Sequence, residues 1–200
     1  MAERPRPILA HVYWNRELFD GEIHPSLRGT MQACALYLLK RRDAIDKIFI
    51  AGGYLWGEEY PSFAQVLTYE LEDIGVAGPI TCVAKATDTS GEIDLFLKEA
   101  KKEKWSNLTF LANRDHLRRI DDLLRAKKVK GATLIASEDV LVQYPFFQNF
   151  VENFGQSEHE ELFKKYNNKV LLAYRLKLGW LLKLASKGRK EKKPPSLFDA

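Results

Sequence analysis

A histidine and an arginine three residues apart are the strongest chemical signal in this sequence. They lie within residues 113–119 (NRDHLRR), directly after a short apolar run. The spacing places His116 and Arg119 on one face of a helix. A histidine titrates near neutral pH and can move a proton, whereas an arginine can hold an anion. A cation near a helix N-terminus is electrostatically unfavourable, so the pair needs either a neighbouring acid or a functional reason.

The glycine-rich loop at residues 52–57 (GGYLWG) is a second candidate. Glycines let backbone amides approach a ligand closely, and the helix that follows favours an anion at its N-terminus. The loop matches neither of the common phosphate-binding fingerprints. A turn that needs positive φ explains Gly52 and Gly53 equally well. Ser62, placed just before the helix, is predicted to cap it rather than to bind a ligand.

The segment from Asp88 to Glu92 (DTSGE) stands between an apolar run and a helical pattern. Thr89 and Glu92 have the spacing of a capping box, in which each side chain bonds the other's backbone amide. A capped helix start also presents amides and hydroxyls to a ligand. Asp88, Thr89 and Glu92 therefore remain candidate ligand-binding residues, together with Asn113.

Metal chemistry has little support in the residue pattern. His11 falls inside an expected strand, which indicates a core or rim histidine. Cys34 and Cys82 are far apart in apolar surroundings, so neither a zinc pattern nor a disulfide framework is predicted. The acids in the expected loops have no metal-site spacing; they are Asp20, Glu22, Glu58, Glu59 and Asp88.

The elements that must position these residues alternate between apolar runs and helical patterns. The expected strands are 8–14, 47–51, 80–84, 108–112 and 132–136, and the expected helices are 26–42, 62–74, 90–103 and 115–127. This alternation predicts an α/β fold, namely a three-layer, Rossmann-like, doubly wound and mainly parallel sheet. Ligands in such folds bind beyond the carboxyl ends of the strands. The loops at 14–25, 52–61, 85–91 and 113–115 are expected there.

The sequence pattern and the distribution of charge indicate three parts within the 200 residues. We expect a Rossmann-like domain over 1–140, a C-terminal helical extension over 141–186 and a basic, disordered tail over 187–200. The net charge is +4, and from residue 183 onward there are six basic and two acidic residues. The body therefore has no excess charge to attract nucleic acid. No signal-like segment and no long apolar run are present, so a cytoplasmic location is expected.

The extension contains a strongly apolar helical pattern over 169–186. A helix that is apolar over much of its circumference must bury against another surface. The body, a second subunit in a homodimer and a membrane surface all stay open as that surface. The basic tail would support peripheral membrane contact at about 1 kcal/mol per cationic residue near an anionic leaflet.

Residues 8–136 resemble the YdcF-like family, which has no known biochemical function and also contains the SanA and ElyC envelope proteins. The resemblance depends on the order and spacing of short motifs: Gly52-Gly53, Ser62-Phe63-Ala64, Asp88-Thr89 with Glu92, and Asn113 with His116 and Arg119. The chain departs from the family where Phe63 replaces an acid, Asp88 replaces an asparagine and Ala112-Asn113 replaces threonine-serine. The resemblance implies a Rossmann-like fold, and one member is reported to bind S-adenosylmethionine.

Together these observations predict a small-molecule-binding α/β protein whose ligand is anionic or nucleotide-like. The expected pocket contains Gly52, Gly53, Ser62, Asp88, Thr89, Glu92, Asn113, His116 and Arg119. If the protein is an enzyme, Arg119 would hold an anionic group and His116 would act as acid or base. S-adenosylmethionine enters as a ligand by resemblance alone. The alternative is a non-catalytic interaction protein that acts through its C-terminal helix and basic tail.

Overall fold

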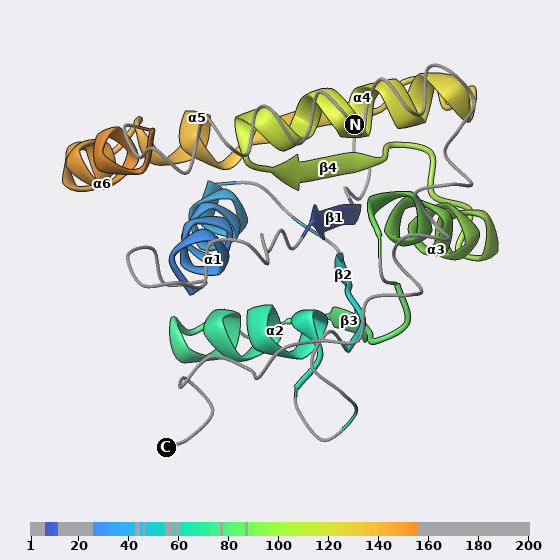
Figure 1. Cartoon of the computed structure of the whole chain (residues 1–200), viewed down its shortest axis with the longest axis horizontal. Coiled ribbons are helices and arrows are strands. Elements are labelled where there is room, and N and C mark those ends of the chain that lie inside the picture. The colour runs from blue at the N-terminus through green and yellow to red at the C-terminus, as the bar shows by residue number, and fades with distance from the viewer. Residues whose placement is uncertain are drawn as a thin grey trace.

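The computed structural model describes residues 7–11, 26–42, 45, 47–54, 58, 61–76, 78–86 and 88–155. Strands and helices alternate along the chain (Figure 1) in the order β1 (Pro7–His11), α1 (Ser26–Arg42), β2 (Lys47–Ala51), α2 (Phe63–Asp73), β3 (Ile80–Val83), α3 (Thr89–Lys102), β4 (Thr109–Ala112), α4 (Arg114–Ala126), β5 (Thr133–Ala136), α5 (Ser137–Leu141) and α6 (Pro145–Gly155). The five strands form one parallel sheet in the order β3-β2-β1-β4-β5. The expected α/β, doubly wound fold is confirmed.

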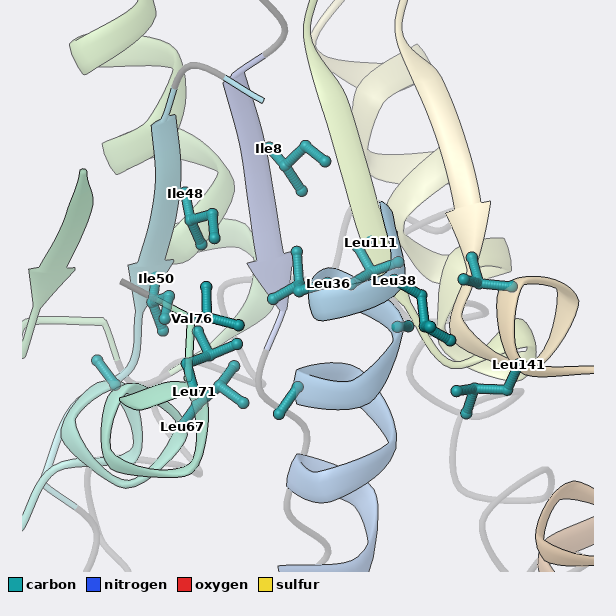
Figure 2. Close-up of a cluster of buried hydrophobic side chains, with 14 of the residues drawn as sticks. Ile8, Leu36, Leu38, Ile48, Ile50, Leu67, Leu71, Val76, Leu111 and Leu141 are labelled. Carbon is teal, nitrogen blue, oxygen red and sulfur yellow. The ribbon is translucent and has the colours of Figure 1, made fainter. Parts of the chain in front are cut away.

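Helices cover both faces of the sheet and enclose two separate hydrophobic clusters. Successive strand residues point to opposite faces, so Ile48 and Ile50 enter one cluster and Phe49 and Ala51 enter the other. The first cluster, shown in Figure 2, joins the sheet to α1, α2 and α5. The second joins it to α3 and α4. Figure 1 shows α1 and α2 on one side of the sheet and α3 on the other.

The order of the strands creates a switch point between β1 and β4. From β1 the chain moves outward to β2 and then β3, with α1 and α2 on one face. It then returns through α3 on the other face, and adds β4 and β5 on the far side of β1. Helices that leave β1 and β4 therefore diverge to opposite faces. In doubly wound sheets ligands bind at this point, beyond the carboxyl ends of the strands.

The C-terminal part of the described chain forms two helices, of which α6 lies within the helical extension expected over 141–186 and the short α5 was not predicted. The aromatic segment after residue 144 is helical in α6, and the short α5 precedes it directly after β5. Phe147, Phe150 and Val151 pack partly against the first cluster, whereas Phe146 is 88% exposed. The expected apolar helix at 169–186 and the basic tail lie outside the described residues. Among the described helices none is long and apolar enough to cross a bilayer.

Candidate functional site

The two glycines after β2 use their backbone amides within the protein. Gly52 N–H donates to the carbonyl of Val83 at 3.1 Å, and Gly53 N–H donates to the carbonyl of Ala86. Neither glycine has positive φ, so that expectation was wrong; Gly75 has it, at +83°. A side chain at Gly52 would have its Cβ 2.8 Å from the Cβ of Phe63. The glycine is therefore needed for the close approach of β2 to the start of α2.

Ser62 caps α2, as the sequence predicted. Its hydroxyl accepts the Gln65 N–H at 3.2 Å, and the Gln65 side chain accepts the Ser62 N–H at 2.8 Å. This is a complete capping box, in which two amides at the helix start are satisfied reciprocally. Ser62 is fully buried. Its hydroxyl is therefore occupied by the helix start.

The start of α3 differs from the expected capping box of Thr89 and Glu92. Asp88 is the N-cap residue, and its carboxylate accepts the Gly91 N–H at 2.8 Å. An aspartate directly before the helix reaches the third helical amide without help from Thr89. The Thr89 hydroxyl is consequently released for another partner. Thr89 and Glu92 are both buried, at 4% exposure.

The start of α4 is held by an acid from α5, the short helix that follows β5. Asn113 is the N-cap residue but makes no capping bond with its side chain. Instead, the Arg114 N–H donates to both carboxylate oxygens of Glu138, at 3.1 and 3.0 Å. The Arg114 side chain also forms an ion pair with Asp139. Cations near a helix N-terminus are electrostatically unfavourable, and the sequence alone did not show which acids compensate for them. Glu138 and Asp139 are those acids.

A buried hydrogen bond joins the starts of α3 and α4. The hydroxyl of Thr89 lies 3.2 Å from Nε2 of His116, and His116 is fully buried. The two helices cover the same face of the sheet, and their first turns meet there. His116 therefore faces α3 and not solvent. Because α4 begins at Arg114, His116 lies in its first turn and Arg119 in its second.

A second buried hydrogen bond links Asn113 to α1 across the switch point. Gln32, fully buried, donates from Nε2 to Oδ1 of Asn113 at 3.3 Å. This bond orients the amide of Asn113, so its two N–H donors point elsewhere. Ser137 lies beside Asn113, because Ala112 and Ala136 are paired in register at the ends of β4 and β5.

Three buried polar atoms on α4, before it and at the start of α5 have no hydrogen-bond partner. They are Nδ2 of Asn113, Nε of Arg119 and the hydroxyl of Ser137. Asn113 is 1% exposed and Arg119 is 8% exposed, and among the described residues no carboxylate forms an ion pair with Arg119. Buried polar groups in folded proteins are nearly always paired, so these three unpaired atoms need an explanation.

The structure thus separates the predicted residues into two groups. Gly52, Gly53, Ser62 and Asp88 are used for packing or capping. The others are buried polar residues of α3, of α4 and of the position before α4; together with the buried polar residues Gln32, Ser137 and Glu138 we call this set the edge cluster, which comprises Gln32, Thr89, Glu92, Asn113, His116, Arg119, Ser137 and Glu138. Sequence reasoning missed Gln32, Ser137 and Glu138. The position directly after the fifth strand could have revealed the last two, whereas Gln32 has no local signal.

Several other sequence predictions have simple outcomes. Cys34 and Cys82 are both free thiols; Cys34 is partly buried, whereas Cys82 is exposed on the edge strand β3. His11 is the last residue of β1, and Glu58 is exposed. Within the described ranges no three His, Cys, Asp or Glu side chains are grouped closely enough to hold a metal ion. The loop 14–25, with Asp20 and Glu22, and residue 59 lie outside those ranges.

Comparison with known proteins found no match. The chain matches no protein-family model, no curated protein and no solved structure. The resemblance to the YdcF-like family therefore stays a prediction from short motifs. The edge cluster itself is the basis for any statement about function.

Proposed function

We propose that this protein binds a small anionic molecule at the edge cluster, beyond the carboxyl ends of β1 and β4. The observation that carries the proposal is the buried Arg119, whose Nε has no hydrogen-bond partner. An arginine stays charged in proteins, and a buried charge is normally paired. A bound anion would supply the missing partner.

The neighbouring donors support the same conclusion. The amide nitrogen of Asn113 is buried and also has no partner, and the Ser137 hydroxyl beside it is likewise unpaired. Hydrogen bonds between ionised and neutral partners are about twice as strong as neutral ones, so an anion would gain from each donor. The location agrees with the general rule for doubly wound sheets, where ligands sit at the switch point.

His116 is the group that would move a proton if the ligand reacts. Its Nε2 is held by the Thr89 hydroxyl at 3.2 Å, which fixes the orientation of the ring. A fixed imidazole next to a bound anion is suited to general acid or base catalysis. Membership of the YdcF-like family and a cytoplasmic location are part of this proposal. S-adenosylmethionine is one ligand to try, because its carboxylate could meet Arg119 although the whole molecule is not an anion.

Thermal unfolding with a metabolite panel tests the proposal. A ligand at a hundredfold excess over its dissociation constant stabilises the folded protein by about 2.7 kcal/mol. We expect at least one anionic compound to do so in the native protein and to lose its effect in Arg119→Met. Arg118→Met is the matched control, because Arg118 is an exposed arginine on the same helix. Equal stabilisation of both variants, or none of the native protein, would contradict anion binding at Arg119.

A further inference from the structure

Two lysines in a backbone conformation that glycine normally adopts follow the ends of α3 and α4. Lys104 and Lys128 both have a φ of 57° and are both exposed. The two helix ends are alike, because the next amide, that of Trp105 or Val129, donates at 2.9 Å to a carbonyl five residues earlier. Glycine is the usual residue at this position, since a side chain there is strained. Attraction of a cation to the helix dipole offsets only part of this strain at an exposed position.

The loops that contain these two lysines lie side by side at the amino ends of the strands, opposite to the end that carries Asn113. The loops lead into β4 and β5, which are parallel neighbours with Thr109 and Thr133 paired in register. The Thr133 N–H donates to the carbonyl of Leu108 at 2.9 Å, which joins the two loops directly. The ends of α3 and α4 therefore meet at one edge of the sheet.

An ion pair also brings the end of α4 to the face of α3 that carries further lysines. Nζ of Lys127 lies 2.6 Å from Oδ1 of Asp94 in α3. Lys98 and Lys101 follow Asp94 by four and seven residues, so they lie on the same face of that helix. The lysines of both helix ends consequently belong to one surface.

This surface has an excess of positive charge. Residues 98–107 and 125–131 contain eight basic side chains and two acidic ones. Three of the basic side chains form ion pairs with nearby acids, namely Lys102, Arg125 and Lys127. The other five are exposed and form no ion pair within the described part of the chain; we call them the amino-edge patch, which comprises Lys98, Lys101, Lys104, Lys128 and Lys130. Unpaired cations gathered on one surface attract an anionic partner.

The composition of the amino-edge patch favours a lipid surface over a nucleic acid. All five cations are lysines, whereas arginine is the residue that recognises phosphates and base edges through paired hydrogen bonds. Single-stranded nucleic acids also stack their bases on exposed aromatic side chains. The exposed large apolar residues of the described chain lie on other elements; they are Tyr54, Tyr69, Val142 and Phe146. Lysines act on an anionic bilayer as point charges and need no such geometry.

We propose that the amino-edge patch binds the surface of a membrane that contains anionic lipids. The contact is electrostatic and lies at the lipid head groups, because the patch has no exposed large apolar side chain to insert. The basic residues from position 183 onward add to the same attraction. Since the patch lies at the amino ends of the strands, this contact leaves the switch point at their carboxyl ends open to a ligand.

Co-sedimentation of the full chain with vesicles tests this inference. We expect binding to phosphatidylcholine vesicles only when they contain phosphatidylserine, and weaker binding as salt is added. The double variant Lys104→Gly with Lys128→Gly removes two charges, so its binding should be weaker by about 25-fold. The same variant relieves the strain at both positions, so its melting temperature should rise by about 2–4 °C. A loss of binding together with a gain in stability cannot result from unfolding.

Two further double variants complete the test. Lys101→Gln with Lys130→Gln retains both strained lysines, and should weaken binding as much as the glycine variant does. Lys85→Gln with Arg118→Gln is the matched control, because it removes the same charge from exposed residues outside the patch. We expect the control to bind the vesicles like the native protein.

Three results would overturn the proposal. The first is native binding in both patch variants, which would assign the attraction to the rest of the chain. The second is an equal loss in the control, which would show that net charge alone matters. The third comes from adding a DNA duplex and a single strand of the same length. Tighter binding to either than to the vesicles, lost in both patch variants, would make this surface a nucleic-acid site.

Discussion

Replacing Gly52 by alanine tests whether this glycine serves packing. The new Cβ would lie 2.8 Å from the Cβ of Phe63 and 3.1 Å from the backbone nitrogen of Ala64. The first distance is about 0.6 Å shorter than ordinary contact, and neither neighbour is the flexible end of a side chain. The start of α2 must therefore move away from β2.

The cost of this movement can be worked out from what it disturbs. Overpacking a buried site by one carbon typically costs about 1–3 kcal/mol. The shift also stretches two hydrogen bonds at the start of α2, from Phe63 N–H to the Gly53 carbonyl at 3.2 Å and from Ala64 N–H to the Gly52 carbonyl at 3.4 Å. We expect Gly52→Ala to lower the free energy of unfolding by about 2 kcal/mol, or about 4–8 °C in melting temperature.

Gly91 provides the matched control. Its added Cβ would meet Ala86 and Asp88 at 3.7 Å, which is ordinary contact, and it lies in the first turn of α3. Alanine at a compatible helical position restricts the unfolded chain, so Gly91→Ala should stabilise the protein by about 0.4–1 kcal/mol. The same substitution, glycine to alanine, is therefore expected to lower the free energy of unfolding at position 52 and to raise it at position 91.

Urea denaturation followed by circular dichroism measures both variants. The midpoint should fall for Gly52→Ala and rise for Gly91→Ala, with unchanged dependence on urea concentration. If Gly52→Ala is as stable as the native protein, the glycine is not required for packing against α2. Contact with a ligand would then be the better explanation for this glycine.

Three further predictions concern the helix cap, the core and the thiols. Ser62→Ala should cost about 0.5–2 kcal/mol in chemical denaturation, because the hydroxyl that accepts the Gln65 N–H is lost while the backbone N–H of residue 62 keeps its bond to the Gln65 side chain, and Ser62→Asp should recover most of it. Phe96→Ala should cost about 3–5 kcal/mol in the same assay, since its fully buried ring packs against three aromatic rings; a loss below 1 kcal/mol would contradict that packing. Burial, and then the charge of Glu70, raises the pKa of Cys34 above its ordinary 9.0. Stability should therefore fall as pH rises above about 9, and Cys34→Ala should reduce the fall in pH-dependent melting; an unchanged profile would exclude Cys34 as its source.

Much of the fold follows from local patterns in the sequence. The apolar runs at 47–51 and 108–112 are strands because β-branched and aromatic residues favour a fully buried sheet. Ser62 caps a helix because its hydroxyl reaches an amide only three residues away. Gly75 ends α2 at positive φ for a similarly local reason, since a residue without a Cβ adopts that conformation at little cost. The positions of the five strands and of α1 to α4, the layers and the sheet direction were therefore predictable, whereas α5 was not.

The candidate site depends on contacts that only the tertiary structure determines. Gln32 and Asn113 are 81 residues apart, Thr89 and His116 are 27 apart, and Glu138 is 24 residues from the amide it accepts. A sequence pattern shows that a residue can cap, donate or carry charge, but not which partner arrives from another strand. The order β3-β2-β1-β4-β5 brings these partners together at one edge. The strand order therefore determines which buried polar groups form hydrogen bonds within the protein and which, like Nε of Arg119, have no partner.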